Sequence, residues 1–350
     1  MNNKLSIKVL KNIDLELEKE WKNFEENGNF HFFQKLDIIK EYVRLNPINY
    51  FFVLIYLDNK IIAILPLEIY KFFGIKILQW IGTKEFDYCC PLISNFEKLN
   101  INKEKFSHLW KEILSKIDDF DLVWFNKQPK SIFDMSNPFV IFLDNNDFTE
   151  VYSVKLPNNI NEYVDKIQNK KFISEFLRTK KKLMSENKVS FEILDSKDTK
   201  VYPSNLISHK ASVLDKKNIK HFLNEKLMNF YDNLYTSNPN SFQLSVLKID
   251  NEIIAANLGL ILKNRFYYFL PTIFSEKFNK FSPGKILILN LIEWCMSNKI
   301  KIFDFGLGDE NYKKYWSNNS NGLFRHTQFR SLKGFFCFIF LKIYLFIKKF

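Results

Sequence analysis

The densest chemistry in the sequence follows an expected strand at residues 301–305. The run 306–316 reads Gly-Leu-Gly-Asp-Glu-Asn-Tyr-Lys-Lys-Tyr-Trp, with its two glycines directly after the strand. Glycine at a strand end permits a sharp turn or the close approach of a ligand to the backbone. Asp309, Glu310, Tyr312 and Lys313 then place carboxylates, a phenol and an amine beside that turn. These groups predict acid–base chemistry together with the binding of an anion.

A second candidate site precedes this segment, at the start of an apolar helix expected over residues 286–296. Ser282 suits the N-cap of that helix and Pro283 suits its first position. Gly284 would let a ligand approach the backbone, and Lys285 would add a positive charge. Because the N–H groups at a helix start attract phosphate, the pattern predicts an anion site. An ordinary capped helix is the alternative, and the neighbouring segment 301–316 favours the site.

The elements that would position these residues belong to an internal duplication. Residues 57–63 read Leu-Asp-Asn-Lys-Ile-Ile-Ala, and residues 249–255 read Ile-Asp-Asn-Glu-Ile-Ile-Ala, at an offset of 192. The same offset matches Asn46-Pro47 with Asn238-Pro239, and Phe30 with Phe222. Two unrelated hairpins that share a common turn are the alternative, and the ungapped matches favour duplication.

Each copy predicts the same order of elements. A helix ends at the Asn-Pro pair because proline disfavours the helical conformation of the residue before it. Two strands joined by an Asp-Asn turn follow, and then a third strand. The expected ranges are 32–45, 50–57, 61–70 and 77–81 in the first copy, and 220–236, 242–249, 253–262 and 265–270 in the second. The sequence therefore predicts two domains of one α+β architecture, each a mainly antiparallel sheet with flanking helices.

Charge and composition limit the classes of partner that the chain is expected to bind. The chain has 350 residues, 46% hydrophobic, with 51 Lys and Arg against 39 Asp and Glu, a net charge of +12. Such a composition excludes a disordered chain and favours anionic partners. Half of the excess lies in an expected amphipathic helix at Lys166–Lys188, which suits an acidic substrate, a membrane surface or RNA; a solvated basic face is the alternative.

The cysteines and the two terminal segments indicate the cellular compartment in which the protein is expected. Cys89, Cys90, Cys295 and Cys337 form no Cys-x-x-Cys pair, so the sequence predicts a reduced, cytoplasmic setting without a zinc site. No secretory signal is recognisable at the N-terminus. The apolar and basic tail 334–350 is short for a membrane span. It is interpreted either as a peripheral anchor at the inner face of the membrane or as an element packed on the core.

Taken together, these segments resemble a known family. The order strand, Ser-Pro-Gly, apolar helix, Asp-Phe-Gly-x-Gly-Asp-Glu-x-Tyr-Lys-x-x-Trp resembles the GNAT-type acyltransferases related to the CelD protein of cellulose biosynthesis. The segments Trp80–Tyr88 and Leu156–Leu183 resemble that family in the same order. The resemblance implies two tandem GNAT-like domains, as in FemAB-type peptidyltransferases, over residues 1–150 and 151–333, followed by the tail 334–350.

The resemblance also implies acyl transfer from an acyl-CoA, either acetyl-CoA or a longer one, to an amine, without a metal. Ser282, Pro283, Gly284 and Lys285 would hold the CoA pyrophosphate. Asp309 or Glu310 would act as the base, and Tyr312 would protonate the leaving thiolate. The residues implied for substrate binding are Asp87, Tyr88, Gly306, Gly308, Lys313 and Trp316. The expected acceptor is an amino sugar or a polysaccharide or cell-envelope precursor.

Two other functions stay open at this point. A FemAB-type transferase would use aminoacyl-tRNA, held by the basic helix, although only 5 of the 51 cations are Arg. A non-catalytic part of a polysaccharide assembly is suggested by the apolar tail. It is also suggested by the segment Phe278–Lys285, which lacks the glycine-rich Arg/Gln-x-x-Gly-x-Gly/Ala loop of GNAT enzymes. Nucleic acid is an expected partner only if the reaction depends on tRNA.

Overall fold

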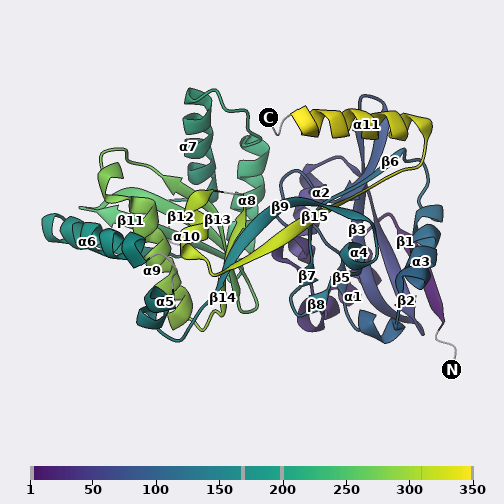
Figure 1. Cartoon of the computed structure of the whole chain (residues 1–350), viewed down its shortest axis with the longest axis horizontal. Helices are drawn as coiled ribbons and strands as arrows, with labels where there is room; N and C mark the ends of the chain where they lie inside the picture. The colour runs from purple at the N-terminus through teal and green to yellow at the C-terminus, as the bar shows by residue number, and fades with distance from the viewer. Residues whose placement is uncertain (1–3, 167–169, 198–200, 309, 348–350) are drawn as a thin grey trace. The chain divides into compact units, whose positions relative to one another are not determined.

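The computed structural model describes residues 4–166, 170–197, 201–308 and 310–347, and the chain forms two compact units (Figure 1). The first unit comprises Met1–Thr149 and Gly322–Phe350, and the second comprises Glu150–Asn321. This division differs from the expected boundaries at the C-terminal end. Residues 322–333 and the tail belong to the first unit, because a strand and a helix from this region pack on its sheet.

The first unit contains a mixed sheet in the order β1, β2, β3, β4, β6 and β15, in which β4 and β6 run parallel and the other neighbours antiparallel. The strands are β1 (Leu5–Leu10), β2 (Asn49–Leu57), β3 (Lys60–Phe72), β4 (Ile75–Trp80), β5 (Leu92–Ile93), β6 (Leu122–Pro129), β7 (Ser131–Ile132), β8 (Met135–Ser136) and β15 (Asn319–Phe329). The helices are α1 (Leu15–Asn27), α2 (Leu36–Leu45), α3 (Lys103–Ser115), α4 (Pro138–Ile141) and α11 (Leu332–Ile347).

The second unit repeats this plan with the order β10, β11, β12, β13, β14 and β9, and here β13 and β14 are the parallel pair. The strands are β9 (Asn145–Lys155), β10 (Val189–Leu194), β11 (Phe242–Ile249), β12 (Glu252–Leu262), β13 (Arg265–Ile273) and β14 (Ile302–Leu307). The helices are α5 (Ile160–Lys166), α6 (Lys170–Glu186), α7 (Pro203–Lys216), α8 (Glu225–Ser237), α9 (Pro283–Ser297) and α10 (Asn311–Trp316). In each unit the strands are mainly antiparallel and are flanked by helices, which confirms the predicted fold class.

The duplicated hairpin is conserved in its backbone details. Asp58 and Asn59 have φ values of 49° and 66°, and Asp250 and Asn251 have 51° and 72°. Positive φ at both central residues is the mark of a type I′ turn, which matches the twist of the flanking strands. Both hairpins also carry a register shift at equivalent positions, after Ile55 in one copy and after Leu247 in the other, again 192 residues apart. Two unrelated hairpins would not be expected to share this irregularity.

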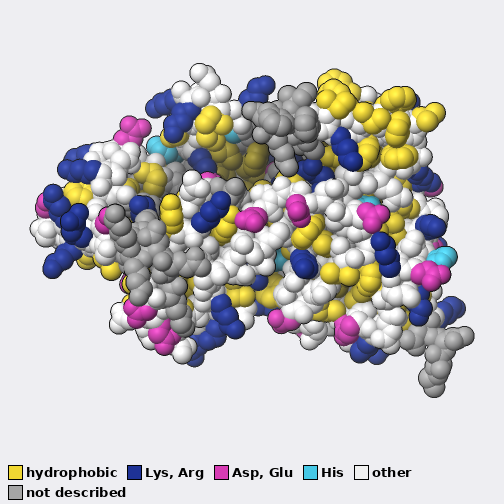
Figure 2. Space-filling view, viewed as in Figure 1, with side chains coloured by type: hydrophobic (Ala, Val, Ile, Leu, Met, Phe, Trp, Pro, Cys, Tyr) yellow, Lys and Arg dark blue, Asp and Glu magenta, His cyan; other side chains and the backbone are white. Residues whose placement is uncertain are grey.

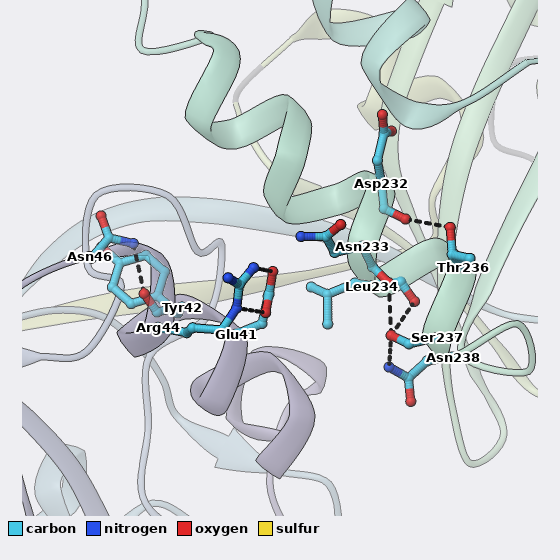
Figure 3. A network of polar contacts seen from close by, with 10 residues as sticks. All are labelled: Glu41, Tyr42, Arg44, Asn46, Asp232, Asn233, Leu234, Thr236, Ser237 and Asn238. Carbon is cyan, nitrogen blue, oxygen red and sulfur yellow. Dashed lines mark hydrogen bonds and ion pairs between the residues drawn. The ribbon is translucent and has the colours of Figure 1, made fainter.

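The Asn-Pro breaks end α2 and α8 at equivalent positions, although Figure 3 shows different side-chain contacts: Asn46 Nδ2 donates to Tyr42 O, and Asn238 Nδ2 donates to Ser237 Oγ. Asn46 ends α2 and its backbone N–H donates to Tyr42 O; Asn238 ends α8 and its N–H donates to Leu234 O. The Phe30–Phe222 match does not extend to the structure, because Phe30 is buried whereas Phe222 is 40% exposed. The expected helix 220–236 begins later, at Glu225, because the Asn224 side chain caps it.

Helix α9 is the centre of the second unit's core. Ile286, Leu287, Leu291 and Ile292 are buried, with apolar side chains of α6 and of the sheet in the same cluster. Helices α5 and α6 lie on the same side of the sheet as α9, whereas α7 and α8 cover the other side (Figure 1). Because both faces are covered, nearly all residues of β11 and most of those of β12 are buried, polar ones included.

Candidate active site

The parallel pair β13 and β14 sets the position of the candidate site. Their pairing covers Arg265–Tyr267 and Ile302–Asp304, although β13 continues to Ile273 and β14 to Leu307. The two strands therefore separate towards their carboxyl ends. Helix α9 connects them as a crossover and runs back along the sheet, so its first turn lies at the same edge as those ends. The fold thus brings the two predicted segments, 282–285 and 306–313, to one edge of the second unit.

Asp304 fixes the turn that follows β14. Its carboxylate is 1% exposed; Oδ2 lies 2.8 Å from Arg265 Nη1, and Oδ1 accepts the Gly306 N–H at 2.8 Å. Gly306 has a φ of 67°, in the left-handed region where a side chain is unfavourable. One buried acid therefore ties β13 to the glycine turn. No role was predicted for Asp304, although its place two residues before Gly306 is a usable signal.

Beyond that turn, Gly308, Glu310 and Lys313 lie together. Lys313 Nζ donates to Leu307 O at 2.6 Å and forms an ion pair with Glu310 Oε2 at 2.9 Å. Gly308 has a φ of 122°, and a Cβ there would lie 2.3 Å from Glu310 Oε2 and 2.9 Å from Lys313 Nζ. The backbone conformation therefore favours glycine, and a side chain at this position would displace the ion pair. The Lys313 side chain is 4% exposed, so its charge is presented at a fixed place on the turn.

Tyr312 lies at the point where the strands separate. It packs against the core cluster that contains Tyr268, the β13 residue just past the last pair with β14. Burial raises the pKa of Tyr312, and the charge of Glu310 raises it further. Burial also raises the pKa of Tyr268, with a contribution from Tyr312. Both phenols therefore remain protonated at neutral pH, and each is suited to donate a proton rather than to accept one.

The start of α9 agrees with the prediction in position but not in detail. The helix begins at Pro283, with Ser282 at the N-cap. Ser282 is in the left-handed region (φ 54°), and its side chain makes no capping hydrogen bond. The Lys285 N–H donates to Ser282 O at 2.9 Å. A Cβ on Gly284 would lie 3.2 Å from Ile273 Cδ1, at the end of β13, which places this turn against that strand end.

The remaining residues predicted for this unit fall in different places. Asp309 lies outside the described residues. Trp316 is fully buried; its ring packs edge-on against Phe176 at 5.6 Å, and its carbonyl accepts the Tyr163 hydroxyl at 2.7 Å. The implied substrate-binding role of Trp316 is therefore corrected to a core role, because its ring has no exposed surface. The basic helix is described as α5 and α6, and residues 167–169 lie outside the described residues.

The first unit holds the predicted pair Asp87 and Tyr88 in its loop after β4. Tyr88 is 2% exposed and its ring stacks on His31 at 4.3 Å, so it is a packing residue here, whereas Asp87 is half-buried. Lys127, with a φ of 57°, donates from Nζ to Phe86 O at 2.7 Å and so supports this loop from β6. The loop is therefore held in one conformation by a buried cation.

A buried carboxyl cluster beside this loop was not predicted. Glu68 is 3% exposed, and Gln79 Nε2 donates to its Oε1 at 2.7 Å. The Tyr42 hydroxyl donates to Glu85 Oε2 at 2.8 Å. Burial raises the pKa of Glu68 to about 7, and the charge of Glu85 adds to this shift. The signal in the sequence was a single acid within the apolar strand Ile61–Tyr70.

This cluster predicts a pH-dependent stability. A carboxyl with a raised pKa in the folded state binds more protons there than in the unfolded chain, so stability falls as pH rises from about 4.5 to about 7. Glu68 contributes at most about 3 kcal/mol to this loss in the free energy of unfolding. Urea denaturation at several pH values should show a smaller decline in Glu68→Gln than in the wild-type protein, because burial of Glu25 also raises the pKa of that carboxyl and contributes to the loss in both proteins. The control variant Glu112→Gln, at an exposed site on α3, should show the same decline as the wild-type protein. If the free energy of unfolding changes with pH equally in the wild-type protein and in Glu68→Gln, the raised pKa of Glu68 is refuted.

The described part of the chain lacks both a metal-binding cluster and a membrane-spanning helix. Within residues 4–166, 170–197, 201–308 and 310–347, no three His, Cys, Asp or Glu side chains are grouped so as to hold a metal ion. Among the helices of those residues, none combines the length and the apolarity needed to cross a membrane.

Comparisons with known proteins agree with this geometry. Residues 170–314 match the family model described as an acetyltransferase (GNAT) domain. No curated protein gives a significant sequence match. Among solved structures, FemX has a TM-score of 0.59 at 11% identity, covering 88% of this chain and 95% of that one. A conserved protein of unknown function from Bacteroides thetaiotaomicron VPI-5482 has a TM-score of 0.57 at 8% identity, covering 93% and 100%.

A tandem GNAT protein from the clavulanic acid biosynthesis pathway has a TM-score of 0.51 at 9% identity, covering 93% of this chain and 98% of that one. Identities this low show the fold alone. The resemblance to CelD relatives is not confirmed by these comparisons. The chain has the fold of a tandem GNAT protein, and the match of residues 170–314 to an acetyltransferase (GNAT) domain supports a transferase enzyme.

Proposed function

We propose that the second unit transfers an acyl group from an acyl-CoA to an amine. The observation that carries this proposal is the separation of β13 from β14 beside Tyr268 and Tyr312, at the edge where α9 begins. Separated strand edges offer backbone hydrogen-bonding groups to an extended, amide-containing chain such as pantetheine. The helix start offers N–H groups to its pyrophosphate. The family match over residues 170–314 supports the same donor.

The pyrophosphate would bind at the first turn of α9. Ser282 and Pro283 set the direction of that turn, and Gly284 lets the phosphates approach the backbone. The Lys285 side chain adds a cation at the second position after proline. This arrangement combines the partial positive charge of the helix start with a full charge, which suits a doubly charged diphosphate.

The reaction then needs one proton removed and one supplied. The amine nitrogen attacks the thioester carbonyl carbon, a C–N bond forms, and the C–S bond breaks. The proton lost by the amine passes to Asp309 or Glu310, directly or through water, and Tyr312 supplies a proton to the thiolate. Glu310 is 58% exposed and paired with Lys313, so it can exchange that proton with solvent. Lys313, held against the Gly306–Gly308 turn by its bond to Leu307 O, is proposed to bind an anionic part of the acceptor.

The acceptor is proposed to be an amino sugar or another amine-bearing precursor of a polysaccharide or of the cell envelope. In the first unit, Asp87 stays a predicted substrate-binding residue, whereas Tyr88 is buried. The proposed compartment is the cytoplasm.

The test is release of free CoA thiol by the purified full-length protein supplied with mixed acyl-CoAs and amino sugars. We expect thiol release that requires both an acyl-CoA and an amine, and a rise in melting temperature with CoA alone. Absence of both effects would refute the proposal. If aminoacyl-tRNA serves as donor where acyl-CoA does not, the FemAB-type reaction replaces it. An inactive protein that still binds a polysaccharide-assembly partner would indicate a non-catalytic role.

A further inference from the structure

Helix α11 is fixed to the first unit at its start. The Ser331 hydroxyl donates to Asp121 Oδ1, and the Arg330 guanidinium donates to Ile117 O at 2.7 Å. The Gly334 N–H in turn donates to Ser331 Oγ at 3.1 Å. A Cβ on Gly334 would lie 1.9 Å from Asp121 O, so only glycine lets the helix approach this closely. The helix is therefore an integral part of the unit rather than a free tail.

One side of α11 completes a small core. Cys337 is 6% exposed and packs with Ile77 of β4 and Leu122 of β6, against which Phe338 and Leu341 also pack. Two roles were expected for the tail: packing on the core or contact with a membrane. Along this side of α11, the tail packs on the core. The packed side leaves the opposite side of the helix for a different role.

The opposite side exposes a continuous apolar stripe. The exposed fractions are 79% for Leu332, 67% for Phe336, 38% for Ile339, 62% for Phe340 and 53% for Ile343. Spacings of three and four residues place these side chains on one face of the helix. Figure 2 shows hydrophobic side chains gathered over α11. A contiguous apolar stripe of this kind marks an interaction surface rather than ordinary surface variation.

The charges around the stripe indicate the partner. Residues 330–350 contain five cations and no Asp or Glu: Arg330, Lys333, Lys342, Lys348 and Lys349. Lys333 and Lys342 are exposed on the described part of the helix. A second copy of α11 would bring like charges together without an acid on the helix to pair with them. Apolar side chains flanked by lysines match instead an anionic lipid surface, where the former enter the acyl region and the latter meet headgroups.

We propose that the exposed face of α11, formed by Leu332, Phe336, Ile339, Phe340 and Ile343, binds the surface of membranes that contain anionic lipid. The helix lies in the interface with its packed face held by β4 and β6, so the first unit is anchored as a body. This inference does not depend on the proposed acyl transfer, and it would place the enzyme beside acceptors attached to lipid.

The test is flotation of the full-length protein with vesicles of phosphatidylcholine alone or mixed with phosphatidylglycerol. We expect binding to the mixed vesicles that weakens as salt rises. Phe336→Ser combined with Phe340→Ser should reduce partitioning at least about tenfold. Lys333→Gln and Lys342→Gln should each reduce it about fivefold on mixed vesicles. The matched control is Leu15→Ser, at an 87% exposed leucine at the start of α1, which should bind as wild type does.

Three outcomes would overturn the proposal. One is no binding to either vesicle. Another is equal binding to both vesicle types without an effect of the lysine variants. The third is a wild-type dimer, seen by light scattering, that the double serine variant dissociates while vesicles are not bound; the face would then be a contact between copies. Circular dichroism of each variant should match that of the wild-type protein, because the replaced side chains are exposed.

Discussion

Replacing Asp304 with asparagine should lower the free energy of unfolding by about 3 kcal/mol. The carboxylate is 1% exposed and holds Arg265, whose side chain is 16% exposed. Asparagine retains an oxygen for the Gly306 N–H, so the loss arises mainly from the arginine left buried without a counter-charge. Chemical denaturation of the purified variant measures this change directly.

The matched control is Glu192→Gln, which removes one partner of another ion pair in the same sheet. Glu192 is 43% exposed beside Lys248, and an exposed pair contributes less than about 1 kcal/mol. Adding Arg265→Gln to Asp304→Asn should recover part of the loss, because the unpaired charge disappears. Equal effects of Asp304→Asn and Glu192→Gln would mean that the buried ion pair contributes no more to stability than the exposed one.

Local chemistry explains which parts of the fold were predictable. The Asp-Asn turns were found because few residues tolerate two successive positive φ values, and the structure has them at both predicted places. The start of α9 was found because proline fits the first helical position. Each of these features depends on a few neighbouring residues, so one sequence is sufficient to reveal it.

Features that depend on distant partners were missed. Nothing local in residues 322–329 shows that they pair with β6 rather than continue the second unit. Gly334 looked like the border of a tail, whereas it is the point where a helix meets Asp121 O. Ser282 was expected to cap α9 with its side chain, but the preceding turn places it in the left-handed region, which prevents that bond.

The candidate site was predictable in its residues but not in its supports. Gly306, Gly308 and Lys313 stand in one run of sequence, so their proximity follows from the chain itself. Tyr268 and Asp304 contribute from β13 and β14, and their part becomes visible only once these strands are paired. Trp316 belongs to the same run but points into the core, because a short helix places successive residues on different sides.

Replacing Tyr312 with phenylalanine should lower kcat of acyl transfer about a hundredfold, with little change in the KM for acyl-CoA. The phenol is proposed to protonate the leaving thiolate. This proton donation stabilises the transition state and not the bound substrate, so its loss lowers kcat and leaves KM nearly unchanged. Burial keeps the pKa of Tyr312 above its ordinary value of about 10, so the acid form persists through the alkaline range. The wild-type rate should therefore show no loss from this group as pH rises to about 9, while the acceptor amine becomes deprotonated.

Tyr315→Phe provides the matched control for this variant. Tyr315 is on the same helix, 43% exposed, so loss of its hydroxyl should leave kcat within about twofold of wild type. A merely structural role for Tyr312 would lower stability and would raise KM as the site loosens, with the shape of the pH profile unchanged. A catalytic role predicts a lower kcat at an unchanged melting temperature, and a faster rate for acyl donors with more acidic thiols, because those thiolates need no proton. If Tyr312→Phe keeps more than half of the wild-type kcat, the proton comes from another group or from water.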